Sequence, residues 1–119
     1  MLKVLATGYS SSVIETDDTP YITAANTRTR MGVVALSRDL LKRYTPNAPF
    51  SFGDRIFILG LGEFTVEDSM HHRWKQRMDI WFPSRREAFR FGKKNLYITK
   101  LTDTEETLGE PSFANGALQ

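Results

Sequence analysis

The sequence predicts a single, mainly β domain that folds as a small barrel or sandwich. Its 119 residues are enough for one compact domain with a core of its own. Short runs rich in β-branched and aromatic residues alternate between apolar and polar positions, which is typical of strands with one buried face. Glycine, proline and aspartate turn signals separate these runs, and only two short stretches carry a helical pattern.

The expected strands are short and follow one another closely. They are residues 3–9, 21–23, 32–36, 55–59, 63–68, 77–82 and 95–101. Turn signals separate them at residues 17–20, 53–54 and 60–62. Because no repeat or linker interrupts the series, we expect one barrel domain over residues 1–101. The remainder, residues 102–119, is polar and acidic, and we expect it to form a loose tail.

Two helices are expected, each of one or two turns. Ser37 is a suitable N-cap for residues 38–44, and the prolines that follow prevent that helix from continuing. Ser84 and Glu87 have the spacing of a capping box, and Gly92 stands where the second helix should end. Helices this short leave the strands to form most of the fold.

The composition excludes several classes of protein. The chain has no cysteine, so neither disulfides nor thiolate-bound metal can hold the fold together. No stretch approaches the roughly 20 apolar residues that span a bilayer, and the first residues resemble a strand more than a secretion signal. The tail contributes four acids and no Lys or Arg to a total of +2, which leaves a formal charge of +6 on residues 1–101. A positive body suits an anionic polymer, either nucleic acid or carboxylate-bearing peptidoglycan.

One expected strand carries an aspartate where strands usually lack one. In residues 77–82, alternation points Met78, Ile80 and Phe82 towards the core. Asp79 then shares the other face with Arg77 and Trp81. Because an aspartate in a strand competes with the backbone for hydrogen bonds, its presence needs an explanation.

Asp68 ends the preceding strand and is the natural partner for Asp79. If the two strands lie close across a groove, the carboxylates share a site, and the pKa of one of them should rise. A carboxyl group that stays protonated near neutral pH can act as a general acid. A structural alternative remains open, in which Asp79 pairs with Arg77 or Arg55 and Asp68 only caps a turn.

Ordered blocks along the body resemble a known family. They are Ala6-Thr7-Gly8-Tyr9, Ile22-Thr23-Ala24-Ala25-Asn26-Thr27, Gly32-Val33-Val34-Ala35, Phe52-Gly53-Asp54-Arg55-Ile56, Val66-Glu67-Asp68, Arg77-Met78-Asp79-Ile80 and Ala88-Phe89-Arg90-Phe91-Gly92. The most specific feature is the spacing of eleven positions between the second and third of the family's aspartates. The chain resembles the three-aspartate (3D) domain family, which is related to the C-terminal domain of membrane-bound lytic transglycosylase A and to stationary-phase survival proteins.

The resemblance implies a six-stranded double-psi β-barrel with two short helices and a groove across one side. It implies lytic cleavage of the bond between N-acetylmuramic acid and N-acetylglucosamine in peptidoglycan, with Asp79 as the single acid/base and Asp68 beside it. Ser37 stands where the family has its first aspartate, and Asp39 is the candidate replacement. The resemblance also implies a cell-envelope or periplasmic location, and no cofactor. A non-catalytic glycan-binding module on the same barrel is the alternative.

Further candidates for substrate binding lie on the first strands. Thr7 and Tyr9 alternate with small residues, so both can face the groove. Tyr9 could hydrogen-bond the catalytic carboxylate or stack on a sugar ring, and core packing is an equal alternative. Thr23 could donate its hydroxyl to Asp79, although an ordinary strand threonine is also consistent with the pattern.

The loop between the two aspartates is basic and aromatic. Arg73-Trp74-Lys75-Gln76-Arg77 fits a single-stranded nucleic-acid platform, or a sugar stacked on Trp74 with basic groups around it. The neighbouring aspartates would repel phosphates, so we expect glycan rather than nucleic acid, with Arg77, Trp74 and Trp81 at the groove. His71 and His72 should point in opposite directions, which disfavours a metal site. The pattern leaves the oligomeric state open.

Overall fold

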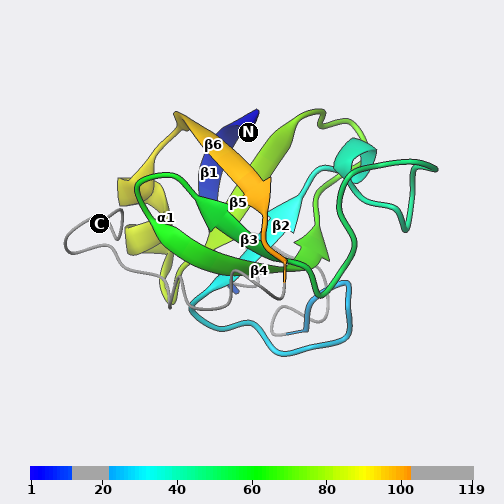
Figure 1. The fold of residues 1–119 in the computed structure, drawn as a ribbon. Coiled ribbons are helices and arrows are strands. Elements are labelled where there is room, and N and C mark those ends of the chain that lie inside the picture. The colour runs from blue at the N-terminus through cyan, green and yellow to red at the C-terminus, as the bar shows by residue number, and fades with distance from the viewer. Residues whose placement is uncertain (12–21, 103–119) are drawn as a thin grey trace.

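Six strands close into a mixed parallel and antiparallel barrel in the computed structural model, which describes residues 1–11 and 22–102 (Figure 1). The strands are β1 (Leu2–Tyr9), β2 (Val33–Leu36), β3 (Arg55–Ile58), β4 (Gly62–Ser69), β5 (Arg77–Trp81) and β6 (Lys94–Lys100). Their order around the barrel is β1-β5-β2-β4-β3-β6, and β6 pairs with β1 again. The mainly β barrel expected from the sequence is confirmed, and the sandwich is excluded.

The barrel combines two parallel strand pairs with four antiparallel ones. The parallel pairs are β1 with β5 and β2 with β4. The antiparallel pairs are β1 with β6, β2 with β5, β3 with β4, and β3 with β6. Consequently β5, β2 and β4 are consecutive, and the two segments that carry the predicted aspartates are separated by β2 alone.

Side chains at alternate positions of the strands fill the inside of the barrel, and in β2 all four residues are buried. Met78 and Ile80 are fully buried, as alternation predicts, while Phe82 follows β5 and packs against the core from its edge. The other fully buried large side chains come from all the remaining strands and from the segment after β2. They are Val4, Val33, Val34, Leu36, Leu41, Ile56, Ile58, Phe64, Val66 and Ile98.

Only one of the two expected helices is an α-helix. Helix α1 (Arg85–Phe91) is confirmed: the Ser84 side chain accepts the Glu87 N–H at its start, and the chain turns at Gly92 with φ 76°. The helix expected over 38–44 is wrong, because only a 3-10 turn, η1 (Arg38–Leu40), forms there. Leu41 is instead extended and forms a bridge with Phe50, and residues 42–44 then form a turn.

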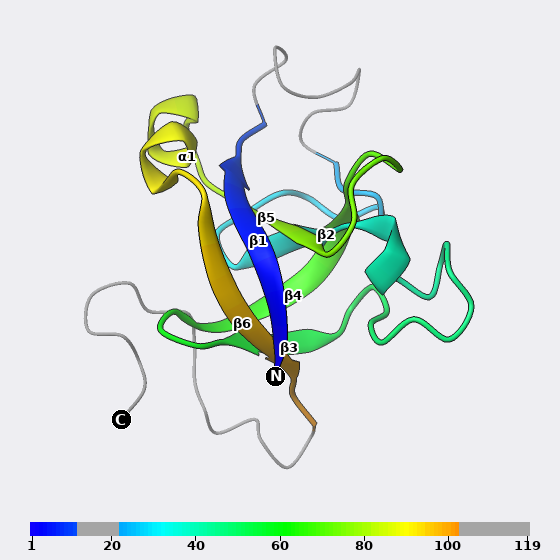
Figure 2. The same ribbon diagram turned by 90° about the horizontal axis from the view of Figure 1, so that it is seen from above.

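Helix α1 and the η1 segment lie on opposite sides of the barrel in both ribbon views (Figures 1 and 2). Of the expected strand at 21–23, residue 21 lies outside the described residues, and Ile22 forms a single bridge with Arg28. The expected turn at 17–20 and the acidic tail, apart from Thr102, lie outside the described residues. Within the described ranges, no helix is long and apolar enough to cross a membrane.

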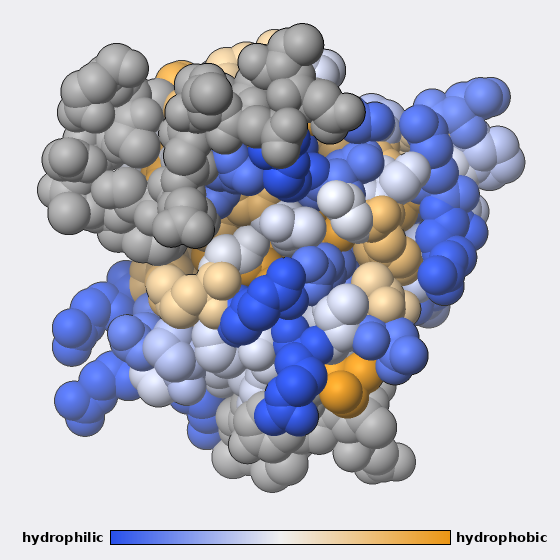
Figure 3. Space-filling view, turned by 60° about the horizontal axis from the view of Figure 1, so that its bottom comes forward, coloured by the Kyte–Doolittle hydropathy of each residue, from blue (hydrophilic) through white to orange (hydrophobic). Residues whose placement is uncertain are grey.

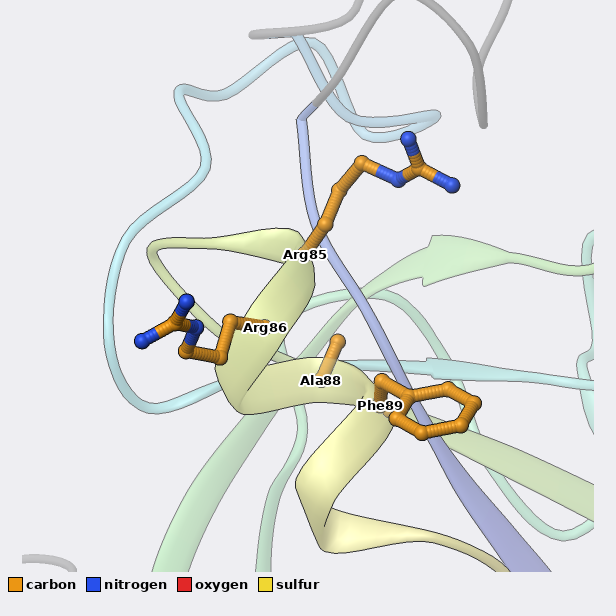
Figure 4. Close-up of a pocket in the computed structure, with 5 residues that line it drawn as sticks. Arg85, Arg86, Ala88 and Phe89 are labelled. Atoms are coloured by element: carbon orange, nitrogen blue, oxygen red, sulfur yellow. The ribbon is translucent and has the colours of Figure 1, made fainter.

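A glycine lets α1 pack closely against β1. A Cβ at Gly8 would lie 2.7 Å from the Ala88 carbonyl oxygen and 3.0 Å from both the Ala88 Cα and the Phe82 ring. Figure 4 shows the shallow pocket at this contact, where Ala88 faces β1 while Arg85 and Arg86 extend outwards in different directions. The helix therefore approaches the strand through backbone contact.

Replacing Gly8 with alanine should destabilise the fold by about 1–3 kcal/mol, because the added methyl group meets backbone atoms that cannot rotate away. Urea unfolding of Gly8→Ala and wild type measures the difference. A second change, Ala88→Gly, serves as the diagnostic variant. It removes a side chain but leaves the obstructing carbonyl in place, so it should not rescue Gly8→Ala. Restored stability in the double variant would contradict this explanation.

Candidate functional site

The two predicted aspartates share the outer face of three consecutive strands. Asp68 in β4 and Asp79 in β5 both pair with Ala35 in β2, one on each side. Directly paired residues point to the same face, and this face is the outer one because Val34 and Leu36, which flank Ala35, are buried in the core. At a strand spacing of about 4.8 Å, the two aspartate Cα atoms lie roughly 10 Å apart.

A β-bulge in β4 turns Asp68 to the outer face. Val66 pairs with Val34 and Asp68 pairs with Ala35, so Glu67 is an extra residue on β4 at this point. Without the extra residue, alternation would put Asp68 on the same buried face as Val66. The carboxylate therefore reaches the site only because the register shifts beside it.

Thr7 holds the carboxylate of Asp79. The two residues pair directly in the parallel β1–β5 ladder, so their side chains project together from the same face. The Thr7 hydroxyl donates a hydrogen bond to Oδ1 of Asp79. Both side chains are half-buried, which leaves the pair accessible from solvent while limiting its freedom.

Tyr9 joins the first strand to Asp68. Its hydroxyl donates to Oδ2 of Asp68 over 3.0 Å, and the other oxygen accepts the backbone N–H groups of Ala24 and Ser69 at 2.8 and 3.0 Å. Burial of the phenol raises the pKa of Tyr9 far above its usual value, and the charges of Asp68 and Asp79 raise it further. Tyr9 is therefore a permanent hydrogen-bond donor, held within the electrostatic influence of both carboxylates.

Glu67, which the sequence reasoning did not single out, anchors the loop beside the site. Its carboxylate accepts two hydrogen bonds from Arg30, at 2.6 and 2.7 Å, and one from the Thr27 hydroxyl at 2.5 Å. The bonded guanidinium and the hydroxyl hold the pKa of Glu67 below its usual range despite its burial. The backbone N–H of Ala25 also donates to the Glu67 carbonyl. These contacts place the neighbouring Ala24 N–H on Asp68.

Two further candidates have partners away from Asp79. The carboxylate of Asp39 accepts the backbone N–H of Gln76, which lies three positions before Asp79 and immediately before β5. The Thr23 hydroxyl bonds with that of Thr27, in the turn that leads to the Glu67 contacts. Both therefore stabilise loops that border the site.

The basic and aromatic candidates also have defined positions. The Arg77 guanidinium lies 4.0 Å from the centre of the Trp74 ring, and Arg55 forms a salt bridge with Glu63 at 3.2 Å. Trp81 donates its indole N–H to the Ser11 hydroxyl at 2.9 Å. The two arginines proposed as partners of Asp79 thus have other contacts, and the hydrogen bond from Thr7 is one contact that orients the Asp79 carboxylate.

The two histidines do not point apart, so that expectation was wrong. The rings of His71 and His72 lie 4.2 Å apart because these residues form a turn, where strand alternation does not apply. Between residues 22 and 102, and in the first eleven, no group of three or more histidine or acidic side chains is arranged to hold a metal ion.

One face of the molecule mixes polar and apolar residues. Figure 3 shows hydrophilic residues gathered along the right edge of this face. Small hydrophobic areas lie beside them, towards the middle of the view. Such a surface suits a polar ligand better than an extended apolar partner. The arrangement of Thr7, Tyr9, Asp68 and Asp79 can hold a hydroxyl-rich ligand and exchange a proton with it.

Substituting Glu67 by glutamine should destabilise the protein by about 1–2 kcal/mol at neutral pH, since the buried carboxylate loses its charge while the half-exposed Arg30 keeps its own. A depressed pKa adds stability above the ordinary carboxyl range, and this stability is lost as pH falls through the folded-state pKa. The gap between Glu67→Gln and wild type should therefore close in acid. Urea unfolding across pH 3–7 tests this, with Glu63→Gln as the control for a more weakly bonded acid on the same strand. If the difference in unfolding free energy between Glu67→Gln and wild type did not change with pH, the charge of Glu67 would not be its cause.

Comparison with protein-family models and with curated proteins found no match to this chain. The motif blocks in the sequence and the geometry of the two aspartates are the features that bear on its function.

Proposed function

We propose that the protein cleaves peptidoglycan as a lytic transglycosylase does, with Asp79 as the acid/base. The observation that carries the proposal is the common outer face of Asp68 and Asp79, one strand apart, with a fixed hydroxyl donor on each. Asp68 and Asp79 are half-buried rather than fully enclosed, which the approach of a sugar requires. A site with one acid/base and one supporting carboxylate suits ring closure without water.

The proposal includes membership of the three-aspartate domain family and a double-psi barrel topology. Two parallel strand pairs within a closed six-stranded barrel support this topology. The motif blocks supply a second line of support, because the segments that resemble the family include Thr7, Tyr9, Asp68 and Asp79, the residues that meet at the candidate site. Peptidoglycan as substrate would place the working protein in the cell envelope.

In the proposed reaction, protonated Asp79 donates its proton to the glycosidic oxygen, and the bond from the muramyl C1 to that oxygen breaks. The N-acetylglucosamine strand leaves as an alcohol. The Asp79 carboxylate then takes the proton of the muramyl C6 hydroxyl, whose oxygen bonds to C1 and closes the anhydro ring. Thr7 holds the carboxylate in one orientation through both steps. Atoms and protons balance without a water molecule.

Asp68 and Tyr9 act as positioning residues in this proposal. Asp68 accepts hydrogen bonds from Tyr9 and from two backbone N–H groups, which fixes its carboxylate beside the site. The fixed negative charge can stabilise positive charge that develops at C1 and favours the proton remaining on the neighbouring acid. Tyr9 stays neutral and keeps donating throughout the pH range of the reaction.

A glycan-binding module without catalysis is the second candidate. The observation that favours it is that Ser37 occupies the position of the family's first aspartate. That hydroxyl is fully buried and accepts the Arg77 N–H at 2.9 Å. Asp39, the candidate replacement, is bonded to the Gln76 backbone. A barrel that kept Asp68 and Asp79 on its outer face and lost the first acid could still bind the glycan strand.

Asp79→Asn should lower the release of anhydro-muropeptides from purified peptidoglycan by at least about 100-fold, because asparagine cannot donate the proton. Chromatography of the soluble products measures the release. Glu63→Gln, an equivalent acid-to-amide change on β4, should retain activity. The enzyme hypothesis is rejected if wild type releases no anhydro products at any pH. If Asp79→Asn also sediments with insoluble peptidoglycan as wild type does, the protein is a binding module.

Tyr9→Phe should lower kcat by about 10–100-fold with little change in KM, because Asp68 loses a donor that positions it. The acid limb of the pH–rate profile should move to higher pH, since a carboxylate that has lost a donor holds its proton longer. Tyr97→Phe, an exposed tyrosine on β6, is the matched control. An effect confined to stability, with an unshifted profile, would show that Tyr9 is only structural.

A further inference from the structure

A strongly basic surface borders the aspartate site and has no role in the proton transfer proposed above. We call it the basic patch. Its cations and its aromatic rings come from the segment after β2, from the β4–β5 loop and from the first residue of β5. The patch consists of Arg38, Lys42, Arg43, Tyr44, Phe52, Arg73, Trp74, Lys75 and Arg77.

Hydrogen bonds join the two segments into one surface. The Arg38 Nε donates to the Met70 carbonyl over 3.1 Å, and the hydroxyls of Tyr44 and Ser69 lie 3.1 Å apart. In both ribbon views these segments lie away from α1 (Figures 1 and 2). The two segments therefore form one connected surface on one side of the barrel.

Aromatic rings hold the guanidinium groups of the patch in place. Arg38 lies 4.5 Å from the centre of the Tyr44 ring, and Arg43 lies 5.1 Å from that of Phe52. Trp74 carries two such groups, Arg73 at 4.6 Å and Arg77 at 4.0 Å. A guanidinium that stacks through its face keeps its N–H edge available for a carboxylate or phosphate.

The cations of the patch have no acidic partner within the residues that the structure describes. The salt bridges found there join Arg30 with Glu67, Arg55 with Glu63, and Lys100 with Asp54. Asp39 lies in the segment after β2 beside these cations, and its carboxylate accepts the Gln76 N–H. Unpaired cations gathered on one side attract an anion, and they repel one another until an anion binds.

The patch continues directly into the aspartate site. Ser69, which contacts Tyr44, follows Asp68 in β4. Arg77 lies two residues before Asp79 on β5, and alternation puts both on the outer face. A ligand that covers both areas meets carboxylates at one end and guanidinium groups at the other.

We infer that the basic patch binds the carboxylate groups of the peptide branches on a glycan strand whose sugars lie at Asp68 and Asp79. This inference rests on the proposed function and names the form of the substrate, a peptide-bearing strand. A glycan with acidic branches matches both areas, since neutral sugar rings meet the aspartates while the branch carboxylates meet the guanidinium groups. A nucleic acid carries a phosphate at every nucleotide, so a strand spanning both areas would bring phosphates against the aspartates. The arginines around Trp74 also compete with a base for its ring.

Binding of two soluble strand preparations tests the inference, one with its peptide branches and one with the branches removed enzymatically. Wild type should bind the peptide-bearing strand about tenfold more tightly at low salt, and this preference should fall as salt rises. The triple variant Arg43→Gln/Arg73→Gln/Lys75→Gln should bind both strands alike. Arg86→Gln/Arg90→Gln/Lys93→Gln makes the same change in net charge on and after α1 and should keep the preference.

A preference that survives in the patch variant, or tighter binding of a single-stranded oligonucleotide than of the peptide-bearing strand, would overturn the inference. Measuring anhydro products in parallel separates it from the proposed function. If products form without any preference between the strands, only the carboxylate subsite is wrong. If the preference is present and depends on the patch but no products form, the chemistry is wrong and the subsite stands.

Discussion

The candidate site depends on a single irregularity, the β-bulge where β4 pairs with β2. The extra residue, Glu67, reverses the direction of every side chain that follows it on β4, and so Asp68 leaves the core face and joins Asp79 beside Ala35. A buried, unpaired carboxylate at position 68 would cost far more than a local break in the hydrogen-bond ladder. The register shift thus resolves a conflict between an acidic side chain and an apolar barrel interior.

The same bulge also connects the site to its surroundings. The carboxylate of the extra residue, Glu67, accepts hydrogen bonds from Arg30 and Thr27. These contacts fix the loop whose Ala24 N–H donates to Asp68. On the other side, parallel pairing of β1 with β5 brings Thr7 onto Asp79. Each carboxylate is therefore oriented by a segment distant in the chain, which is the rigidity that a proton-transfer site needs.

Strand positions were predictable because each strand has one buried and one exposed face, and the period-two pattern records this difference directly. Helix α1 was predictable for a similar reason, since its cap residues act locally through Ser84 and Glu87. The helix expected over 38–44 failed because a tertiary bridge to residue 50 outweighed the weak preference of a short segment. The close contact between the His71 and His72 rings was not predictable from strand alternation, because that pattern does not apply within a turn.

By itself, the sequence determined that the chain forms a mainly β domain and that aspartates stand at the end of one strand segment and inside the next, since these follow from local pattern and residue identity. Only the tertiary structure decided which strand separates the aspartates, which donors orient them, and that Glu67 belongs to the site's support. Strand order and register depend on contacts between distant segments, and a bulge of one residue leaves no distinct mark in the local pattern.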